Sequence, residues 1–223
     1  MTEQHLQILA DILFIAEREG LPVPPLTEQR DKLSLDDAYA IQMKNIDRVV
    51  KMGYTISGKK IGLTSPGIQR QLGVSEPDYG HLFTAMDCPD GLVDTSQLIQ
   101  PKIEAELAFV LGADLTGPNV TVEHVRNATE YVVGAFEIVD SRVAEWKIKL
   151  ADTVADNASS GRYILGEKRM SVEDADLSAE SMKLYKNGNL IEEGIGANVL
   201  GDPCVAVAWL ANKLRDYGVF LKK

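Results

Sequence analysis

Cysteine is scarce in this sequence. The 223 residues include only Cys88 and Cys204, which are too far apart to form a C-x-x-C pair. This usage argues against a disulfide scaffold and against a zinc ribbon, and it is typical of a reducing compartment. We therefore expect a cytoplasmic protein.

Long apolar runs are missing as well. No stretch approaches the roughly 20 apolar residues that a membrane-spanning helix needs. Residues 1–20 lack a basic region, and Asp11 interrupts their apolar positions, so this segment does not resemble a signal peptide. The sequence predicts a soluble protein without a membrane partner.

Positively charged residues are fewer than negatively charged ones. The chain has 23 Lys and Arg and 33 Asp and Glu, which gives a formal net charge of −10. A surface this acidic repels phosphate backbones, so nucleic acid is not expected as a partner. The sequence also lacks the G-x-G-x-x-G and Walker A motifs. A nucleotide cofactor therefore has no support.

Apolar residues are present in the amount that a sizeable core requires, at 45% of the chain. Helical spacing of apolar residues predicts a helix over residues 3–19, which Gly20 ends. The proline-rich connector at residues 21–26 is not expected to be helical. A capping-box-like start at Ser34 then predicts a second helix over residues 37–52.

From residue 54 the pattern favours a mixture of strands and short helices. Strands are predicted over residues 54–64, 102–112, 131–140 and 163–166. Helices are predicted over residues 66–72, 121–130 and 203–217, with a hairpin around Asn187-Gly188 and a turn or loop at residues 77–80. Strict βαβ alternation is absent, which indicates an α+β fold with a helical N-terminal lobe (residues 1–53) and a second domain of strands and helices (residues 54–223).

Two glutamates stand two residues apart in the apolar segment at residues 102–112. Side chains alternate between the faces of a strand, so Glu104 and Glu106 are expected to point the same way. The apolar strand at residues 131–140 contains a third, Glu137. Carboxylates in such positions cost free energy unless a positive group lies between them.

Two interpretations of these glutamates stay open on the residues alone. The three could converge on a hard divalent cation, because oxygen-only ligands suit Mg²⁺ or Mn²⁺. The alternative is that they are solvated residues on the exposed face of a sheet, or partners of Lys59 and Lys102.

Several motifs in a fixed order resemble one family. They are GKKIGLTS (58–65), EPDYGHL (76–82), PKIEAELAFVLG (101–112), FEIVDSR (136–142) and DTVADNASS (152–160). Together they resemble the 2-keto-4-pentenoate hydratase family, also called 2-hydroxypenta-2,4-dienoate hydratases, of the fumarylacetoacetate hydrolase superfamily. The resemblance runs from about residue 25, where PLTEQR begins, to residue 214.

The resemblance implies a fumarylacetoacetate hydrolase-like core, a mixed β-sheet roll or barrel with flanking helices, and assembly into homo-oligomers. Family chains usually continue beyond the point that matches FLKK at residues 220–223. The resemblance therefore implies that the domain at residues 54–223 lacks the C-terminal strands of the family core.

The resemblance also assigns roles to single residues. It implies that Mg²⁺ or Mn²⁺ binds to Glu104, Glu106 and Glu137, that the catalytic residues are Lys60 and Asp78, and that the substrate is bound by Ser159 and Ser160. On the residues alone, Lys60 could face solvent and Asp78 would be a turn residue. His81 could transfer protons or be structural, and Asp140 with Arg142 suggests a structural ion pair.

The implied reaction is the addition of water to 2-hydroxypenta-2,4-dienoate, which gives 4-hydroxy-2-oxopentanoate in aromatic meta-cleavage catabolism. A sister family, the 2-oxo-3-hexenedioate (4-oxalocrotonate) decarboxylases, is the main alternative, because PDGLVDTSQLIQPKIEAE at residues 89–106 resembles that family too. A superfamily hydrolase that cleaves a C–C bond and a non-catalytic subunit are further alternatives. The FEIVDSR and EWKIK segments favour the hydratase.

Overall fold

A computed structural model of the chain describes residues 1–29 and 33–223, so residue 30, at the end of the PLTEQR segment, lies outside the described residues. The chain divides into two compact units. The first comprises Met1–Gly62, Asp78–Glu104 and Glu137–Ile164, and the second comprises Leu63–Pro77, Ala105–Phe136 and Leu165–Lys223. The predicted domain boundary between residues 53 and 54 stays a prediction.

Three helices begin the first unit, α1 (Glu3–Glu19), α2 (Leu26–Gln29) and α3 (Leu35–Lys51). The predictions of α1 and α3 are confirmed: Gly20 ends α1 at φ 65°, and the Ser34 side chain accepts a hydrogen bond from the backbone of Asp37. The predicted non-helical connector needs a correction at its last residue, because Leu26 begins α2. Leu26 is fully buried, and this tertiary contact stabilises a helix that is too short to form alone.

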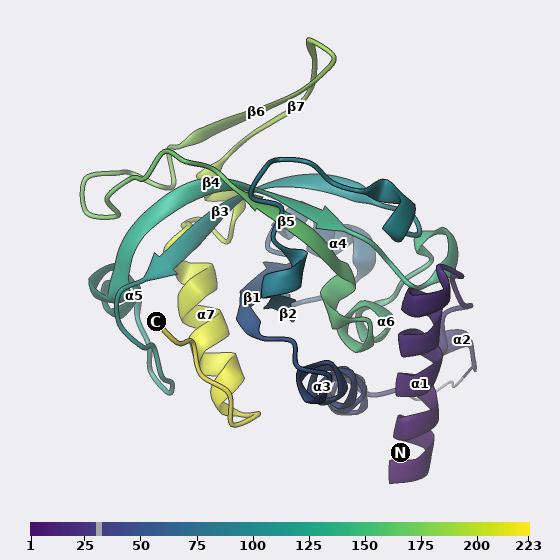
Figure 1. Ribbon diagram of the computed structural model, residues 1–223. Helices are drawn as coiled ribbons and strands as arrows, with labels where there is room; N and C mark the ends of the chain where they lie inside the picture. Colours follow the sequence, from purple (N-terminus) through teal and green to yellow (C-terminus); the bar gives the residue numbers. More distant parts are fainter. Residues whose placement is uncertain (30–32) are drawn as a thin grey trace. The chain divides into compact units, whose positions relative to one another are not determined.

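Helices α1 and α3 pack against each other (Figure 1). The Asn45 side chain donates to the carbonyl of Ala10 at 2.9 Å, and Arg48 forms an ion pair with Asp11. On α3, the ring of Tyr39 stacks on Tyr79, with ring centroids 4.7 Å apart. This stacking ties the helical layer to the strand that carries Asp78.

Strands β1 (Ile56–Gly62) and β2 (Asp78–Phe83) form an antiparallel ribbon in the first unit. The prediction of β1 is confirmed. The prediction of a turn or loop at residues 77–80 is wrong, because Asp78, Tyr79 and Gly80 are strand residues. Asp and Gly favour turns locally, but pairing with β1 and the burial of Tyr79 outweigh that preference.

A three-stranded sheet has the order β3 (Lys102–Leu111), β4 (Thr129–Val139) and β5 (Ser160–Leu165), and all three strands were predicted. The strands pass from one unit to the other: β3 leaves the first unit after Glu104, and β4 re-enters it at Glu137. The first unit also contains α6 (Leu150–Ala155), which was not predicted. Asp152 caps α6 by accepting a hydrogen bond from the backbone of Lys149 at 2.9 Å.

The second unit contains α4 (Pro66–Leu72), α5 (Val122–Ala128), α7 (Pro203–Arg215) and the hairpin of β6 (Ser181–Lys186) and β7 (Asn189–Ile195), all as predicted (Figure 1). Asn187 and Gly188 both have positive φ, at 52° and 80°, as a type I′ turn requires. Asp202 caps α7 through the backbone of Cys204, and Arg126 of α5 forms an ion pair with Asp202 at 3.5 Å.

Short 3₁₀ helices complete the described chain at Thr84–Met86, Thr95–Gln97, Ala144–Trp146, Asn157–Ser159 and Gly196–Asn198. The predicted α+β fold is confirmed. Over residues 1–29 and 33–223, the strands form separate sheets of two, three and two strands, and none of these sheets closes into a barrel.

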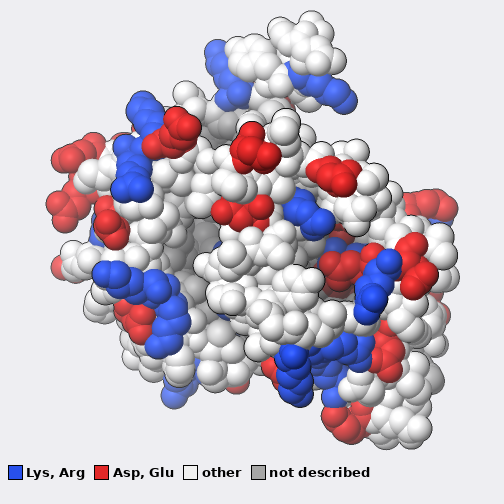
Figure 2. Space-filling view, in the orientation of Figure 1, with Lys and Arg blue, Asp and Glu red and all other residues white. Residues whose placement is uncertain are grey.

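Lys and Arg side chains and Asp and Glu side chains are both spread over the face shown in Figure 2. Within the described part of the chain, none of the helices is both long and apolar enough to cross a membrane.

Candidate active site

The β1–β2 ribbon sets Lys60 and Asp78 on one face. Lys60 and Gly62 are two residues apart on β1 and therefore share one face of the strand, and the same holds for Asp78 and Gly80 on β2. The register pairs Lys60 with Gly80 and Gly62 with Asp78. Each polar residue therefore stands opposite a glycine. A Cβ at Gly62 would overlap the Asp78 carboxylate and lie 3.4 Å from the Lys60 Nζ. The two polar groups thus converge where only a glycine leaves room.

Lys60 is held inside the protein. Its side chain is 9% exposed, which does not fit a solvent-facing lysine. The Nζ atom forms an ion pair with Glu137 at 3.2 Å and donates a hydrogen bond to the carbonyl of Ala158 at 3.0 Å. Burial disfavours the ammonium charge, but the carboxylates of Glu137, Asp78 and Glu104 outweigh it and raise the pKa of Lys60. Lys60 is therefore a fixed positive charge.

Asp78 is buried beside this lysine, with 1% of its surface exposed. One carboxylate oxygen accepts a hydrogen bond from the Thr153 hydroxyl at 3.1 Å, and the other has no hydrogen-bond partner among the described residues. Burial raises the pKa of Asp78, although Lys60 and Thr153 oppose this shift. A carboxyl group of this kind can hold a proton closer to neutral pH than an exposed aspartate can.

The three predicted glutamates come together in space. Each offers one carboxylate oxygen, and these oxygens all lie within 4.8 Å of one another. Glu137 is buried, Glu106 is half-buried and Glu104 is exposed. Burial, reinforced by Glu104, raises the pKa of Glu137 to about 7 despite the opposing Lys60. Binding of a cation by this cluster stays a prediction.

The donor set fits a hard divalent cation. The ligand atoms are carboxylate oxygens only, which Mg²⁺, Mn²⁺ and Ca²⁺ prefer. One ammonium group, that of Lys60, faces the carboxyl groups of Asp78, Glu104 and Glu137, with Glu106 two residues further along β3. Two of these carboxyl groups, those of Asp78 and Glu137, are buried, and buried negative charge that exceeds the positive charge beside it is costly without a further positive group.

Ser159 ends the 3₁₀ turn that follows α6, Ser160 begins β5, and both are buried. The Ser159 hydroxyl donates to Asp156 at 3.0 Å, and the Ser160 hydroxyl donates to the carbonyl of Asn157 at 2.8 Å. A serine has one donor, so both hydroxyls have only acceptor capacity left. Their contact with a substrate stays a prediction.

The predicted ion pair between Asp140 and Arg142 is wrong. The Arg142 guanidinium instead forms a buried ion pair with Asp156, from Nε to Oδ1 at 2.6 Å, and donates to the backbone carbonyl of Asp140. The Asp140 carboxylate accepts hydrogen bonds from the backbone of Ile99 and Gln100. The side chains of Asp140 and Arg142 are close in sequence but point apart, because the chain leaves strand β4 after Val139.

His81 is a buried histidine on the other face of β2 from Asp78. Alternation along β2 places it with Tyr79, whose ring centroid lies 5.9 Å from that of His81. Burial, with a smaller effect of Lys59, lowers the pKa of His81 to about 3. His81 therefore stays neutral near pH 7, which favours a structural role over proton transfer.

We expect the buried His81 to destabilise the protein in acid. Its folded-state pKa of about 3 lies below the unfolded value of 6.5, so the unfolded state binds more protons between these values. The contribution of neutral His81 to the stability should be fully present above pH 6.5 and should be lost as the pH decreases toward 3. Denaturant unfolding across this range should show a shallower loss of stability for His81→Gln, with the half-buried His5→Gln as the control. Equal pH profiles for His81→Gln and the wild type would contradict the assignment.

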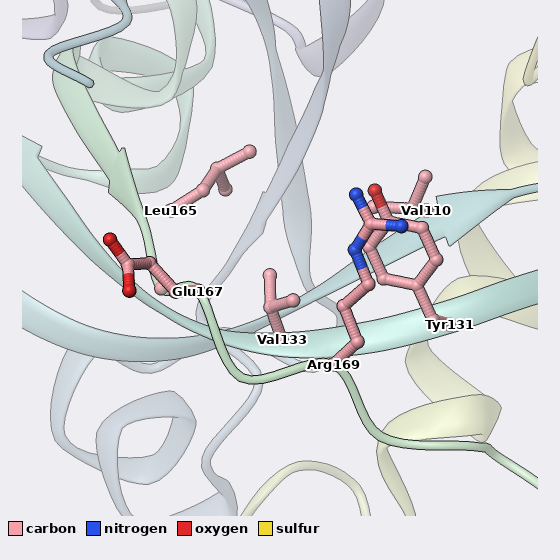
Figure 3. A pocket seen from close by; sticks show the side chains of 7 residues that line it. Val110, Tyr131, Val133, Leu165, Glu167 and Arg169 are labelled. Atoms are coloured by element: carbon pink, nitrogen blue, oxygen red, sulfur yellow. The ribbon is translucent and has the colours of Figure 1, made fainter.

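A separate pocket lies in the second unit, between β3, β4 and the segment after β5 (Figure 3). Its lining consists of Val110, Tyr131, Val133, Leu165, Gly166, Glu167 and Arg169. The Arg169 guanidinium lies 4.2 Å from the centroid of the Tyr131 ring. None of the predicted site residues lines this pocket.

Solved structures define the class of protein. A 4-oxalocrotonate decarboxylase from Pseudomonas putida G7, complexed with magnesium and adipate, matches with a TM-score of 0.95 and 38% identity, covering 100% of this chain and 85% of the other. A putative fumarylacetoacetate hydrolase family protein from Yersinia pestis CO92 matches with a TM-score of 0.53 and 12% identity, covering 76% of this chain and 78% of the other, and shows the fold alone. The fold is that of the fumarylacetoacetate hydrolase superfamily.

Curated relatives define the family. A 2-keto-4-pentenoate hydratase from Paraburkholderia xenovorans (strain LB400) is 47% identical over 219 residues, which is 98% of this chain and 81% of that protein. A 2-hydroxypent-2,4-dienoate hydratase from Pseudomonas putida is 45% identical over 221 residues, 98% of this chain and 100% of that protein. No protein-family model matches the sequence. The chain belongs to the 2-keto-4-pentenoate hydratase family.

Proposed function

We propose that this chain is a metal-dependent hydro-lyase that adds water to 2-hydroxypenta-2,4-dienoate (2-oxopent-4-enoate) and forms 4-hydroxy-2-oxopentanoate. The curated relatives named as hydratases of this substrate support the reaction. The observation that carries the proposal is the buried Lys60–Glu137 ion pair beside the cluster of carboxylates. The metabolic setting that we propose is the meta-cleavage breakdown of aromatic compounds.

We propose that Glu104, Glu106 and Glu137 hold one Mg²⁺ or Mn²⁺ ion. The solved decarboxylase relatives are complexed with magnesium or with calcium, which agrees with an oxygen-ligand site in this superfamily. When bound, the cation would act as a Lewis acid for the oxygens of a 2-oxo acid. Because the metal-free pKa of Glu137 is about 7, a proton competes with the cation for this carboxylate below neutral pH.

Lys60 supplies a positive charge at a fixed position. The reaction removes the proton of the substrate 2-hydroxyl and places a proton on C5, which makes C4 electrophilic. Negative charge grows on the 2-oxygen during this step, and the Lys60 ammonium, which remains protonated, can donate a hydrogen bond to it. Lys60 therefore stabilises the enolate without giving up its own charge.

Asp78 is the candidate for moving protons. After ketonisation, the oxygen of water adds to C4 and a proton adds to C3, so a group must take a proton from water and one must reach carbon. The Asp78 carboxylate has one oxygen held by Thr153, and its pKa is raised by burial, as a proton carrier requires. Ser159 and Ser160 are proposed to accept hydrogen bonds from the substrate or from the attacking water.

The assembly and the compartment are also proposals. Large apolar side chains are exposed on the β6–β7 hairpin, such as Tyr185 at 56% and Ile191 at 59%, and their burial against further copies would favour a homo-oligomer. Neither cysteine forms a disulfide, which supports the cytoplasm as the site of action.

One assay separates the proposed function from its main rival. The purified protein is incubated with 2-hydroxypenta-2,4-dienoate, with Mg²⁺ or with EDTA, and loss of the dienoate absorbance is followed together with the product. We expect Mg²⁺-dependent formation of 4-hydroxy-2-oxopentanoate. The alternative, a decarboxylase, has support from the match to the decarboxylase complexed with magnesium and adipate. It predicts CO₂ release from 2-oxo-3-hexenedioate instead. A non-catalytic subunit would turn over neither acid.

A further inference from the structure

Three successive residues between α6 and β5 have a left-handed backbone. Asn157, Ala158 and Ser159 have φ values of 56°, 49° and 52°. Side chains other than glycine rarely adopt this region, and a run of three persists only where surrounding contacts determine it. The carbonyl oxygen of Ala158 accepts the hydrogen bond from Lys60 at 3.0 Å. The conformation of this turn therefore sets one of the contacts that hold the lysine.

The Asn157 side chain anchors this turn to β2. Its Oδ1 accepts a hydrogen bond from the backbone N–H of His81 at 2.7 Å, and its Nδ2 donates to the carbonyl of His81 at 2.9 Å. One amide thus pairs with both backbone groups of a strand residue. This clamp needs one donor and one acceptor, which an amide has and a carboxylate lacks.

Gly80 lets the turn approach the strand. A Cβ at this position would overlap the carbonyl oxygen of Asn157 and lie 2.8 Å from the Ser160 hydroxyl. Gly80 is also the ladder partner of Lys60. The Asn157 clamp contacts His81, the turn approaches the strand closely at Gly80, and Lys60 is the partner of Gly80. These three features therefore lie at neighbouring positions of the β1–β2 ribbon.

We propose that Asn157 is a positioning residue for Lys60. By pairing with the backbone of His81, it fixes the left-handed turn so that the carbonyl of Ala158 holds the ammonium group in line with Glu137. Both polar groups of the Asn157 side chain form hydrogen bonds with the backbone of His81, which is not one of the proposed metal ligands. The inference rests on the proposed function, in which Lys60 acts on the substrate.

The chain contains a matched control for this clamp. Asn212 on α7, in the second unit, makes the same pair of hydrogen bonds with the backbone of Val120, at 2.9 Å from its N–H and 3.0 Å to its carbonyl. Asn157→Asp and Asn212→Asp remove the same donor and keep the same shape. Asn157→Gly and Asn212→Ala delete each side chain with a residue that the local backbone tolerates.

We expect Asn157→Asp and Asn157→Gly to lower kcat by ~10-fold or more, since a small misplacement of a catalytic group is costly. KM should change little, and both Asn212 variants should keep the wild-type kcat even if they lose as much thermal stability. In a Lys60→Met background, Asn157→Asp should cause no further loss of kcat, because it acts through Lys60. Equal losses of kcat in the two backgrounds, or equal effects of Asn157→Asp and Asn212→Asp on kcat, would overturn the proposal.

A second readout does not depend on turnover. Mass spectrometry can follow the acetylation of Lys60 by acetic anhydride in the folded protein. The side chain is 9% exposed, so we expect slow modification in the wild type and in Asn212→Asp, and several-fold faster modification in the Asn157 variants. Unchanged rates in folded Asn157→Asp would overturn the positioning role. Absence of hydration by the wild type, with the expected acetylation rates, would overturn the proposed function alone.

Discussion

Replacing Glu137 with glutamine should weaken Mg²⁺ or Mn²⁺ binding and lower the hydratase activity together. Loss of a group that merely supports a metal ligand costs ~10–100-fold, so loss of a ligand should cost at least as much. Glutamine keeps the shape and removes the charge, and Glu137 is the most deeply buried of the three carboxylates. Isothermal titration with Mn²⁺ and steady-state kinetics on the same samples measure both effects.

The stability of the same variant distinguishes a metal site from a structural carboxylate. Without metal, neutralising Glu137 relieves its repulsion with Glu104 but leaves the buried Lys60 without its ion-pair partner, so the metal-free variant should be less stable than the wild type. With Mg²⁺, the variant should gain less stability than the wild type does, because binding linkage is weakened.

Glu130→Gln is the matched control for this experiment. Glu130 lies on the same strand β4 and is exposed, so the change should alter neither metal affinity nor turnover. Excess Mg²⁺ should restore part of the activity of Glu137→Gln. Normal Mn²⁺ affinity in Glu137→Gln would show that the cluster is not a metal site.

Replacing Lys60 with methionine should lower kcat/KM by ~10²-fold or more while the fold remains intact. Methionine retains much of the length and apolar stem of the side chain but cannot donate to the developing oxyanion. It also leaves Glu137 without its ion-pair partner, so the kinetics should be measured at saturating Mg²⁺.

Lys59→Met provides the control for Lys60→Met. Lys59 is the next residue on β1 and pairs with His81, so its side chain belongs to the opposite face of the ribbon. Burial lowers the pKa of Lys59 to about 8, and its loss should change stability rather than turnover. If Lys59→Met abolished turnover and Lys60→Met did not, the assignment of the site to the Lys60 face would be wrong.

Sequence pattern alone was sufficient for the elements that local chemistry determines. The caps at Ser34 and Asp202 and the Asn187-Gly188 turn each follow from one or two residues, and the structure has all three. Alternation of side chains along a strand also predicts from the sequence alone that Glu104 and Glu106 lie on one face.

The remaining features depend on contacts between distant segments. Pairing with β1 makes Asp78 a strand residue, although the Asp and Gly of the P-D-Y-G segment favour turns. The partner of Arg142 is Asp156, fourteen residues away, and not the nearby Asp140. Asn157 also gave no signal in the sequence, because its role depends on a left-handed backbone and on the position of β2.

The convergence of Glu137 with the other two glutamates was predicted only with the help of the family resemblance. The residues alone favoured a solvated sheet face, because no pattern in β4 specifies which strand it will pair with. The structure adds that Lys60 and Asp78 share one ribbon face and that Lys60 reaches Glu137. Burial of that contact distinguishes Glu137 from a solvated surface glutamate.

The most direct test of the account is a crystal structure of the protein grown with Mn²⁺, with diffraction data collected at the manganese edge. We expect one anomalous peak, bounded by carboxylate oxygens of Glu104, Glu106 and Glu137 at roughly 2.0–2.2 Å, close to the value for hard six-coordinate cations. The Lys60 ammonium should lie on the same side of the ribbon. An empty carboxylate cluster at saturating Mn²⁺, or a peak held by other residues, would contradict it.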